Sequence, residues 1–287
     1  MKSDLETAIG RAAMRCRRPD GTAYQGLPHR QTLAIARRSA IPVRQVELAA
    51  LAIGIHPRRY ARNGSTLDPA QQARLLASRV AVVGLGGLGG PLVEILARLG
   101  VGAMTLVDGD RFEETNLNRQ ILCTGQSLGH SKVLSAGRRL ALVNPAVQVR
   151  LERHRLTAEN AAALLAGAQL AMDCLDNLPD RFLLEAAARR TRIPLVSAAV
   201  GGSSGQLTVV HPEDSEDLGL CAVYGPAQDA PRHGAETRLG TLPQIVFTLA
   251  GLAANEALKI LLDSGSILRG RLLIVDLMDN RFEVLRL

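Results

Sequence analysis

The sequence predicts an α/β protein built on a doubly wound, mostly parallel β-sheet. Two patterns carry this prediction. A short run of small apolar residues leads into a glycine-rich turn, and strand-like and helix-like segments then alternate along the chain. Such alternation is typical of parallel sheets that helices cover on both faces.

The glycine-rich turn lies within Val80–Pro91, which reads Val-Ala-Val-Val-Gly-Leu-Gly-Gly-Leu-Gly-Gly-Pro. Gly84, Gly86 and Gly89 match Gly-x-Gly-x-x-Gly, whose glycines permit a tight turn, close approach of the backbone to phosphate, and close helix–strand packing. Asp108 ends the next apolar strand, where a ribose-binding carboxylate is expected. Glycine-rich turns also occur for packing alone, but this context favours a Rossmann-like nucleotide site.

The alternation continues to about residue 198. The expected strands are Val80–Val83, Ala103–Val107, Val147–Leu151, Leu170–Cys174 and Pro194–Ala198. The expected helices are Pro69–Ser78, Leu88–Leu99, Ser131–Leu142, Ala158–Leu165 and Arg181–Arg190. Helical connections of this kind join parallel strands.

The last third of the chain departs from this pattern. Gln206–Val210 is expected to be a strand reached by a short glycine-serine turn, so the sheet becomes mixed there. Residues 211–240 contain three prolines and show little periodicity, which indicates a long functional or disordered loop. A helix over Leu242–Leu262 follows, and Leu272–Val275 with Phe282–Leu285 form an antiparallel extension.

Residues 1–66 differ from the rest. They are arginine-rich, are interrupted at Pro19–Gly21 and Gly26–Pro28, and lack strand-like runs, while Val43–Ile53 is typical of an amphipathic helix. We predict a small helical or partly ordered N-terminal prefix over residues 1–66 that docks on a main domain over residues 67–287.

Composition excludes several classes of protein. The apolar stretches are interrupted before membrane-spanning length, and residues 1–20 lack the apolar core of a signal peptide, so a cytoplasmic location without a membrane is expected. The four cysteines form no Cys-x-x-Cys pair, which argues against a disulfide framework and a zinc site. The net charge of +7 is spread along the chain; it could attract nucleic acid or an acidic protein, or be only a solvated surface.

A second cluster of polar residues follows the second predicted strand. It contains Asp108, Asp110, Asn116, Asn118, Arg119 and Gln120. A nicotinamide site needs one acid and apolar walls here, whereas arginine and asparagine beside a phosphate-binding turn suit a nucleotide whose phosphates react. Lys132, at the start of the next helix, could reach the same phosphates or be an exposed first-turn lysine.

A third cluster lies at the carboxyl end of Leu170–Cys174. Because ligands of doubly wound sheets bind beyond this end of the strands, Asp173 and Asp176 are expected to point towards the glycine-rich turn. Asp176 could hold Mg²⁺ against a triphosphate. Alternatively, Asp176 and Asn177 cap the following helix, with Asn177 nearer the cap; both roles are compatible.

From Arg58 to Leu287, these motifs resemble in order and spacing the MoeB/ThiF/HesA family of ubiquitin-activating-type sulfur-carrier adenylyltransferases. The resemblance implies ATP-dependent adenylation of the C-terminal glycine of a ubiquitin-like sulfur carrier with a Gly-Gly tail, of the molybdopterin or thiamine type. It implies a homodimer in which Arg62, from an Arg-Tyr-x-Arg element, completes the partner's ATP site. Nucleic acid is not an expected partner of this branch.

The resemblance also assigns roles to single residues. Asp108 would bind the ribose, Asp176 would hold Mg²⁺, and Asn116, Arg119 and Lys132 would hold the phosphates. The wider set expected to contact ATP comprises Gly84, Gly86, Gly87, Gly89, Asp108, Asp110, Asn116, Arg119, Gln120, Lys132, Asp176 and Asn177. The set expected to act in catalysis comprises Arg62, Asn116, Arg119, Lys132 and Asp176.

Two departures from the family pattern are visible. Many relatives bind a structural zinc through two Cys-x-x-Cys pairs, but this chain offers only Cys221 in the corresponding region, so no zinc is predicted. Some relatives carry a catalytic cysteine before the helix that follows the long loop, and the matching stretch, residues 234–240, has none. Cys221 is therefore expected to be passive.

Two other functions fit part of this pattern. A relative that activates a small carboxylate, as in tRNA threonylcarbamoyladenosine dehydratase, would share the ATP machinery, and the basic prefix could then touch tRNA. The stretch from Ser197 to Thr208 is more similar to the carrier-activating branch. A nicotinamide-dependent oxidoreductase is disfavoured by the polar residues from Asn116 to Gln120 and by Asp176.

Overall fold

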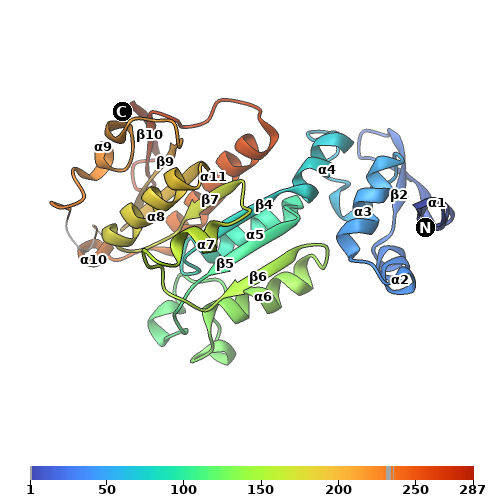
Figure 1. Cartoon of the computed structure of the whole chain (residues 1–287), viewed down its shortest axis with the longest axis horizontal. Helices are drawn as coiled ribbons and strands as arrows, with labels where there is room; N and C mark the ends of the chain where they lie inside the picture. The colour runs from blue at the N-terminus through green and yellow to red at the C-terminus, as the bar shows by residue number, and fades with distance from the viewer. Residues whose placement is uncertain (1, 231–233, 235) are drawn as a thin grey trace.

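The computed structural model describes residues 2–230, 234 and 236–287, and an eight-stranded sheet forms its centre (Figure 1). The strands are β4 (Arg79–Val83), β5 (Ala103–Val107), β6 (Gln148–Glu152), β7 (Leu170–Asp173), β8 (Leu195–Gly201), β9 (Ser204–Val210), β10 (Arg271–Asp276) and β11 (Arg281–Arg286). Their spatial order is β11-β10-β9-β8-β7-β4-β5-β6. The chain thus runs outward from β4 to β6 and then returns to the other side of β4, which creates a topological switch point there.

Strand pairing confirms the predicted mixed sheet. The strands from β6 through β5, β4 and β7 to β8 are parallel, with Val83 of β4 opposite Val107 of β5 and Asp173 of β7. Strands β8 to β11 pair antiparallel and form the expected extension. The carboxyl ends of β4, β5 and β7 therefore meet at one edge.

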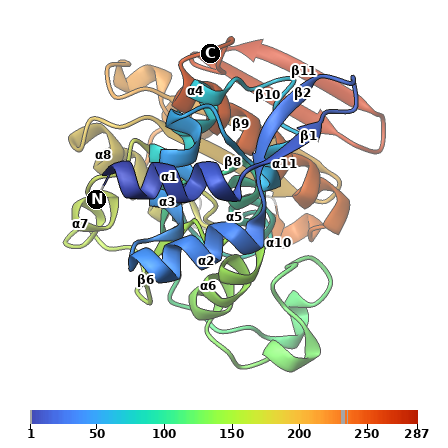
Figure 2. The ribbon, with the colours of Figure 1, turned by 90° about the vertical axis from the view of Figure 1, so that its right-hand side faces the viewer.

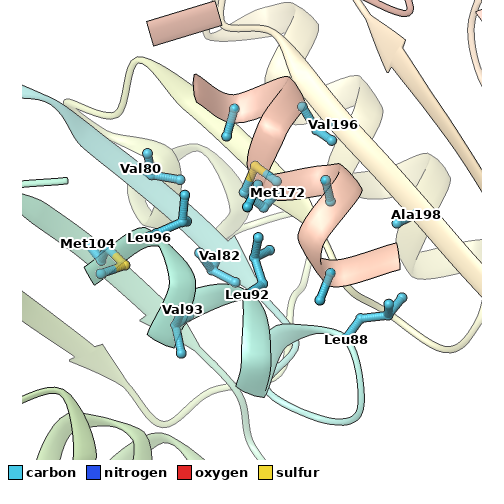
Figure 3. Packing of buried hydrophobic residues seen from close by; sticks show 14 of the residues in the cluster. Val80, Val82, Leu88, Leu92, Val93, Leu96, Met104, Met172, Val196 and Ala198 are labelled. Carbon is cyan, nitrogen blue, oxygen red and sulfur yellow. The ribbon is translucent and has the colours of Figure 1, made fainter. Parts of the chain in front are cut away.

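Helices cover both faces of the sheet. Helices α5 (Gly89–Leu99), α6 (Lys132–Val143) and α11 (Pro243–Leu262) share one core cluster with the sheet, and α7 (Ala161–Leu165) and α8 (Leu178–Arg190) share the other. Figure 3 shows Leu92 and Leu96 of α5 beside Val80 and Val82 of β4, all four fully buried. Burying such a side chain contributes about 1.5–3 kcal/mol. Aliphatic residues build this core, since only 2% of the chain is aromatic.

Most predicted elements are confirmed to within three residues at either end, and two of them differ in detail. Helix α7 begins at Ala161 instead of Ala158, because Thr157 and Asn160 hydrogen-bond each other's backbone N–H groups and form a turn. Residues 211–240 hold short helices within the irregular segment: η4 (Glu216–Leu218), α9 (Cys221–Tyr224) and α10 (Glu236–Leu239). Pro231 and Ala235 of this segment lie outside the described residues.

The expectation that the N-terminal prefix has no strands is wrong. Helices α1 (Lys2–Ala12), α2 (His29–Ser39) and α3 (Val43–Ala52) accompany a small sheet of β1 (Met14–Arg17), β2 (Ala23–Leu27) and β3 (His56–Pro57). The hairpin of β1 and β2 turns at Pro19-Asp20-Gly21, where Gly21 has φ +86° and the Asp20 carboxylate accepts from the Thr22 N–H. Strand β1 is mostly exposed and arginine-rich, so it lacks the apolar alternation by which strands are recognised.

Residues 2–57, here called the N-terminal module, lie at one end of the molecule beside α4 (Pro69–Ala77) (Figures 1 and 2). The module has a core of its own, which includes Ile9, Leu27, Ile35 and Val46. The charge is less evenly spread than expected: residues 1–66 carry twelve Lys and Arg against four Asp and Glu, so the excess of positive charge is concentrated there. The proposed division at residues 66 and 67 stays a prediction.

Helix α11 is long and apolar enough to cross a membrane by length and composition. Its Ile245, Val246, Leu249 and Ala257 are fully buried in the cluster shared with α5 and the sheet. This packing is typical of the central helix of a folded domain.

Candidate functional site

The glycine-rich turn between β4 and α5 is built on close backbone contacts. Gly84 has φ +91°, and a Cβ at this position would lie 2.5 Å from the carbonyl oxygen of Cys174. A Cβ on Gly89 would lie 1.9 Å from the carbonyl oxygen of Gly84. At Gly86 the nearest atom, Nε2 of Gln120, would be 3.5 Å away. The first and last glycines are therefore needed for the fold, whereas the middle one leaves open space.

A cavity of about 710 Å³ lies at this turn, at the carboxyl ends of β4, β5 and β7. It is lined by ten of the residues expected to contact a nucleotide: Gly84, Gly86, Gly87, Asp108, Asp110, Arg119, Gln120, Lys132, Asp176 and Asn177. Gly89, Asn116 and Arg62 are not among its lining residues. We call this space the turn cavity.

Asp108 connects β5 to the turn. Its Oδ2 accepts from the backbone N–H of Leu85 at 2.7 Å, and its Oδ1 accepts from that of Asp110 at 2.8 Å. Burial raises the pKa of Asp108, although Lys132 and the two N–H groups oppose this shift. The carboxylate is thus held in one orientation at the end of β5, the position expected for a ribose ligand.

Lys132 is not the exposed first-turn lysine of the alternative interpretation. Its side chain is 10% exposed, and Nζ lies 3.3 Å from Oδ2 of Asp110. Arg155 contacts Oδ1 of the same carboxylate at 3.2 Å and also lines the turn cavity. The sequence did not single out Arg155, because it follows β6 in an arginine-rich stretch without a motif. Together the two cations provide positive charge on this side of the cavity.

In the loop after β5, some of the residues predicted for the site line the cavity, and one stabilises the loop itself. Oδ1 of Asn116 accepts from the Glu113 N–H at 3.1 Å and caps the short helix η2 (Glu114–Asn116), so Asn116 is buried beside the cavity rather than lining it. Arg119 donates to the Thr115 carbonyl at 2.8 Å and lines the cavity. Gln120 also lines it, and its buried Oε1 has no partner among the described residues. A buried unsatisfied acceptor is unfavourable, which indicates a polar occupant.

Asp173 does not face the turn as expected. It is 1% exposed and forms a buried ion pair with Arg181 of α8, with 2.8 Å between the guanidinium and Oδ2. Ser197 of β8 donates to the same oxygen at 2.6 Å. Asp173 thus ties β7, β8 and α8 together beneath the site. No local sequence pattern predicts this pair, because partners in buried pairs are set by tertiary packing.

Asp176 and Asn177 occupy different positions. Oδ1 of Asn177 accepts from the Asp180 N–H at 3.0 Å, so Asn177 is the N-cap of α8, as the capping interpretation predicts. Asp176 is exposed and lines the turn cavity. Among the described residues no group of three or more His, Cys, Asp or Glu could hold a metal by itself. A single carboxylate next to space for phosphates does fit Mg²⁺, which takes most of its ligands from phosphates and water.

A second cavity of about 820 Å³ adjoins the first, and we call it the side cavity. Asp176, Arg181, Val200 and Thr237 line both. Its remaining wall includes Gln206 of β9 together with Val223, Tyr224 and Leu239 from the irregular segment. The segment that the sequence predicts to be a functional loop thus borders both cavities.

The cysteines show little sign of activation. Cys174 lies beside the glycine-rich turn, and burial raises the pKa of its thiol well above the ordinary range. Burial likewise raises the pKa of Cys123. Cys221 is partly exposed in α9 and is not among the lining residues of either cavity.

The fold and the turn cavity define a doubly wound α/β protein with a nucleotide-type glycine-rich site, and comparison with known proteins agrees. The ThiF family model matches residues 60–287. The SAMP-activating enzyme E1 of Haloferax volcanii is 38% identical over 227 residues, which cover 78% of this chain and 83% of that protein. The sulfur carrier protein adenylyltransferase of Thermus thermophilus is 39% identical over 225 residues, covering 76% and 82%.

The chain belongs to the ThiF family. Among solved structures, the tRNA N6-threonylcarbamoyladenosine dehydratase TcdA of E. coli in complex with ATP has the same fold. Its TM-score is 0.60 and its sequence identity 23%, over 72% of this chain and 94% of that chain. The family match begins at residue 60, so it leaves out the N-terminal module.

Proposed function

We propose that the protein uses ATP to adenylate the C-terminal glycine of a ubiquitin-like sulfur-carrier protein. The carrier carboxylate attacks the α-phosphate, a bond forms between the carboxylate oxygen and phosphorus, and pyrophosphate leaves. The product is an acyl-adenylate. The names of the two relatives above motivate this reaction, and a carrier of the molybdopterin or thiamine type is the expected substrate.

The observation that carries the proposal is the charge arrangement of the turn cavity. A carboxylate that attacks a polyphosphate approaches like charge, so the site must supply positive charge at the phosphates. Lys132, Arg119 and Arg155 line the cavity beside the open space at Gly86. The fixed carboxylate of Asp108 lies at the end of β5, where a ribose binds in this type of fold. Positioning and charge stabilisation are the main requirements of phosphoryl chemistry.

The side cavity supports a protein tail as the second substrate. A Gly-Gly tail is narrow and extended, and it needs a path to the α-phosphate from outside. The side cavity adjoins the turn cavity at Asp176 and Thr237 and has apolar walls at Val223 and Leu239. We propose that the carrier tail enters there.

Asp176 is the proposed Mg²⁺ residue. Bound Mg²⁺ would neutralise phosphate charge, and the exposed Asp176 carboxylate at the cavity wall would hold it. The absence of zinc stays a prediction, as does the cytoplasmic location.

A homodimer with Arg62 acting across subunits completes the proposal. Large apolar side chains remain exposed on the segments that border the turn cavity: Leu117, Ile121, Leu242 and Phe247, each 42–43% exposed. Exposed apolar side chains on several segments beside a site are compatible with an interface there. Arg62 is exposed and does not line the cavity of its own subunit, which is compatible with a role in the partner's site.

ATP–pyrophosphate exchange tests the proposal. Exchange should require a carrier that ends in Gly-Gly and should be lost when the terminal glycine is removed. A carrier panel of molybdopterin and thiamine types would identify the pathway, and Cys221→Ser should leave exchange unchanged. No exchange with any carrier would reject carrier adenylation and favour activation of a small carboxylate, for which modified tRNA is the next substrate to test.

A further inference from the structure

A buried polar cluster joins the N-terminal module to the α/β domain. The Tyr60 hydroxyl donates to Oε2 of Glu47 at 3.1 Å and accepts from Nδ2 of Asn144 at 2.8 Å. The same Asn144 nitrogen contacts the Ala97 carbonyl at 2.8 Å. Glu47, Tyr60 and Asn144 are each no more than 2% exposed. Glu47 comes from α3, Tyr60 from the short helix η1 (Arg58–Tyr60), and Asn144 from the end of α6.

Arg59, next to Tyr60 in η1, makes a second set of contacts with Glu47 and the end of α6. Its Nε lies 3.0 Å from Oε1 of Glu47, and its guanidinium donates to the Val143 carbonyl at 3.3 Å. The remaining guanidinium nitrogen lies 2.7 Å from Nδ1 of His29. The two oxygens of Glu47 thus hold two consecutive residues, and each of these also contacts the end of α6.

The chain is fixed again just beyond Arg62. Nδ2 of Asn63 donates to Oε1 of Gln72 at 3.1 Å, and Nε2 of Gln72 donates to the Leu99 carbonyl at 2.9 Å. The Arg18 guanidinium donates to the Gly64 carbonyl at 2.6 Å. Arg62 therefore lies between two anchored points, and it is exposed and makes no hydrogen bond or ion pair with any residue that the structure describes.

We propose that Glu47 is a positioning residue, through which the N-terminal module orients Arg62 for the ATP site of the partner subunit. This inference rests on the proposed function, because it needs Arg62 to act across the dimer. A buried carboxylate is a costly way to fill space, since an apolar side chain of similar volume would avoid its desolvation. The carboxylate contacts Arg59 and Tyr60 at once. It thereby fixes the backbone position of these two residues, and with it the direction in which the chain continues to Arg62. Consistent with its buried position, the pKa of Glu47 is raised to about 7.

Mixed dimers test the inference. Glu47→Leu keeps the volume but removes both acceptors, and its homodimer should lose exchange activity on the order of 10- to 100-fold, the effect of misplacing a catalytic group. Glu47→Gln has one acceptor oxygen, which can serve Tyr60 but not Arg59 as well, so its loss of exchange should be smaller than that of Glu47→Leu. Thr32→Val is the matched control, since its buried hydroxyl donates to the Pro28 carbonyl within the module, away from Arg59 and Tyr60.

The decisive step is to mix Glu47→Leu with Lys132→Ala subunits. In the mixed dimer one ATP site has an intact Lys132 and receives Arg62 from the subunit with an intact Glu47, so exchange should return. Absence of rescue, where Arg62→Ala with Lys132→Ala is rescued, would show that Glu47 acts only within its own subunit. That result would overturn this inference and leave the proposed function in place.

Two further results would also overturn the inference. One is a Glu47→Leu homodimer as active as wild type. The other is failure of Arg62→Ala to be rescued, which would remove the role across subunits while carrier-dependent exchange by the wild type still stood. If Glu47→Leu does not fold, Tyr60→Phe removes the shared hydroxyl at constant volume and takes its place in the same mixing experiment, with the same outcomes.

Discussion

Asp108 accepts a hydrogen bond from the backbone N–H of Leu85 across the glycine-rich turn, at 2.7 Å. The contact joins the end of β5 to the loop that follows β4, and the second carboxylate oxygen accepts from the Asp110 N–H. The residue expected to bind a ribose therefore also fixes the shape of the turn.

Asp108→Asn should weaken both the fold and nucleotide binding. An asparagine has one acceptor oxygen, so its NH₂ group must face either the Leu85 or the Asp110 N–H. Leaving a buried donor unsatisfied costs about 1–3 kcal/mol. Thermal unfolding without ligand should show this loss, and calorimetric titration with ATP should show weaker binding. An unchanged melting temperature with weaker ATP binding would limit Asp108 to a ligand role.

Gly86→Ala and Gly89→Ala should distinguish the role of the turn in phosphate binding from its role in packing. A Cβ at position 86 has 3.5 Å to its nearest neighbour, so this variant should fold but lose ATP affinity, because the methyl occupies the space for phosphate. A Cβ at position 89 would lie 1.9 Å from a carbonyl oxygen, so that variant should be severely destabilised. Circular dichroism melts and ATP titrations distinguish the two; equal stability would contradict the packing role of Gly89.

Asp176→Ala should abolish Mg²⁺-dependent exchange while leaving the fold intact, because the side chain is exposed and its loss opens no cavity in the core. Exchange measured over a range of Mg²⁺ concentrations provides the test, with Asp229→Ala, an exposed acid of the irregular segment, as the control. Wild-type turnover in Asp176→Ala would remove the proposed metal role.

The sequence predicted the parts of the site that depend on local backbone chemistry. The glycine turn, Asp108 at the end of a strand and the Asn177 cap follow from short-range patterns, and all three are confirmed as structural features. Arg155 and the Asp173–Arg181 pair could not be found in this way, because their partners lie on other elements and are set by the packing of the sheet. Asn116, expected at the phosphates, forms a capping box with Glu113, and its role at the phosphates stays a prediction.

The N-terminal module shows a similar limit. Its hairpin was missed because β1 is exposed and basic, although Pro19-Asp20-Gly21 is a turn signal that could have placed two strands around it. The role of Glu47 was also invisible, since a glutamate within an amphipathic helix is normally on the solvated face. Glu47 is buried here because Arg59 and Tyr60 pack against this face of α3 and contact its carboxylate.

The pH dependence of stability should report on Glu47. Burial raises the pKa of this carboxyl to about 7, against the opposing effects of Arg59 and Tyr60, from an ordinary value of 4.5. Between these two pH values the folded protein binds more protons at this site than the unfolded chain does. The contribution of Glu47 to stability is therefore fully present below pH 4.5, falls as the pH rises towards 7, and is constant above it.

Glu47→Gln removes this titration and keeps one acceptor oxygen, for the Tyr60 hydroxyl. As the pH rises from about 4.5 to 7, the unfolding free energy of the wild type should therefore fall relative to that of Glu47→Gln, by on the order of 1–3 kcal/mol. Urea unfolding at a series of pH values measures it, and Thr32→Val supplies a control whose difference from wild type should not change with pH. A constant difference for Glu47→Gln would mean that Arg59 holds the carboxylate ionised throughout, in which case the cluster is an ion pair at every pH in this range.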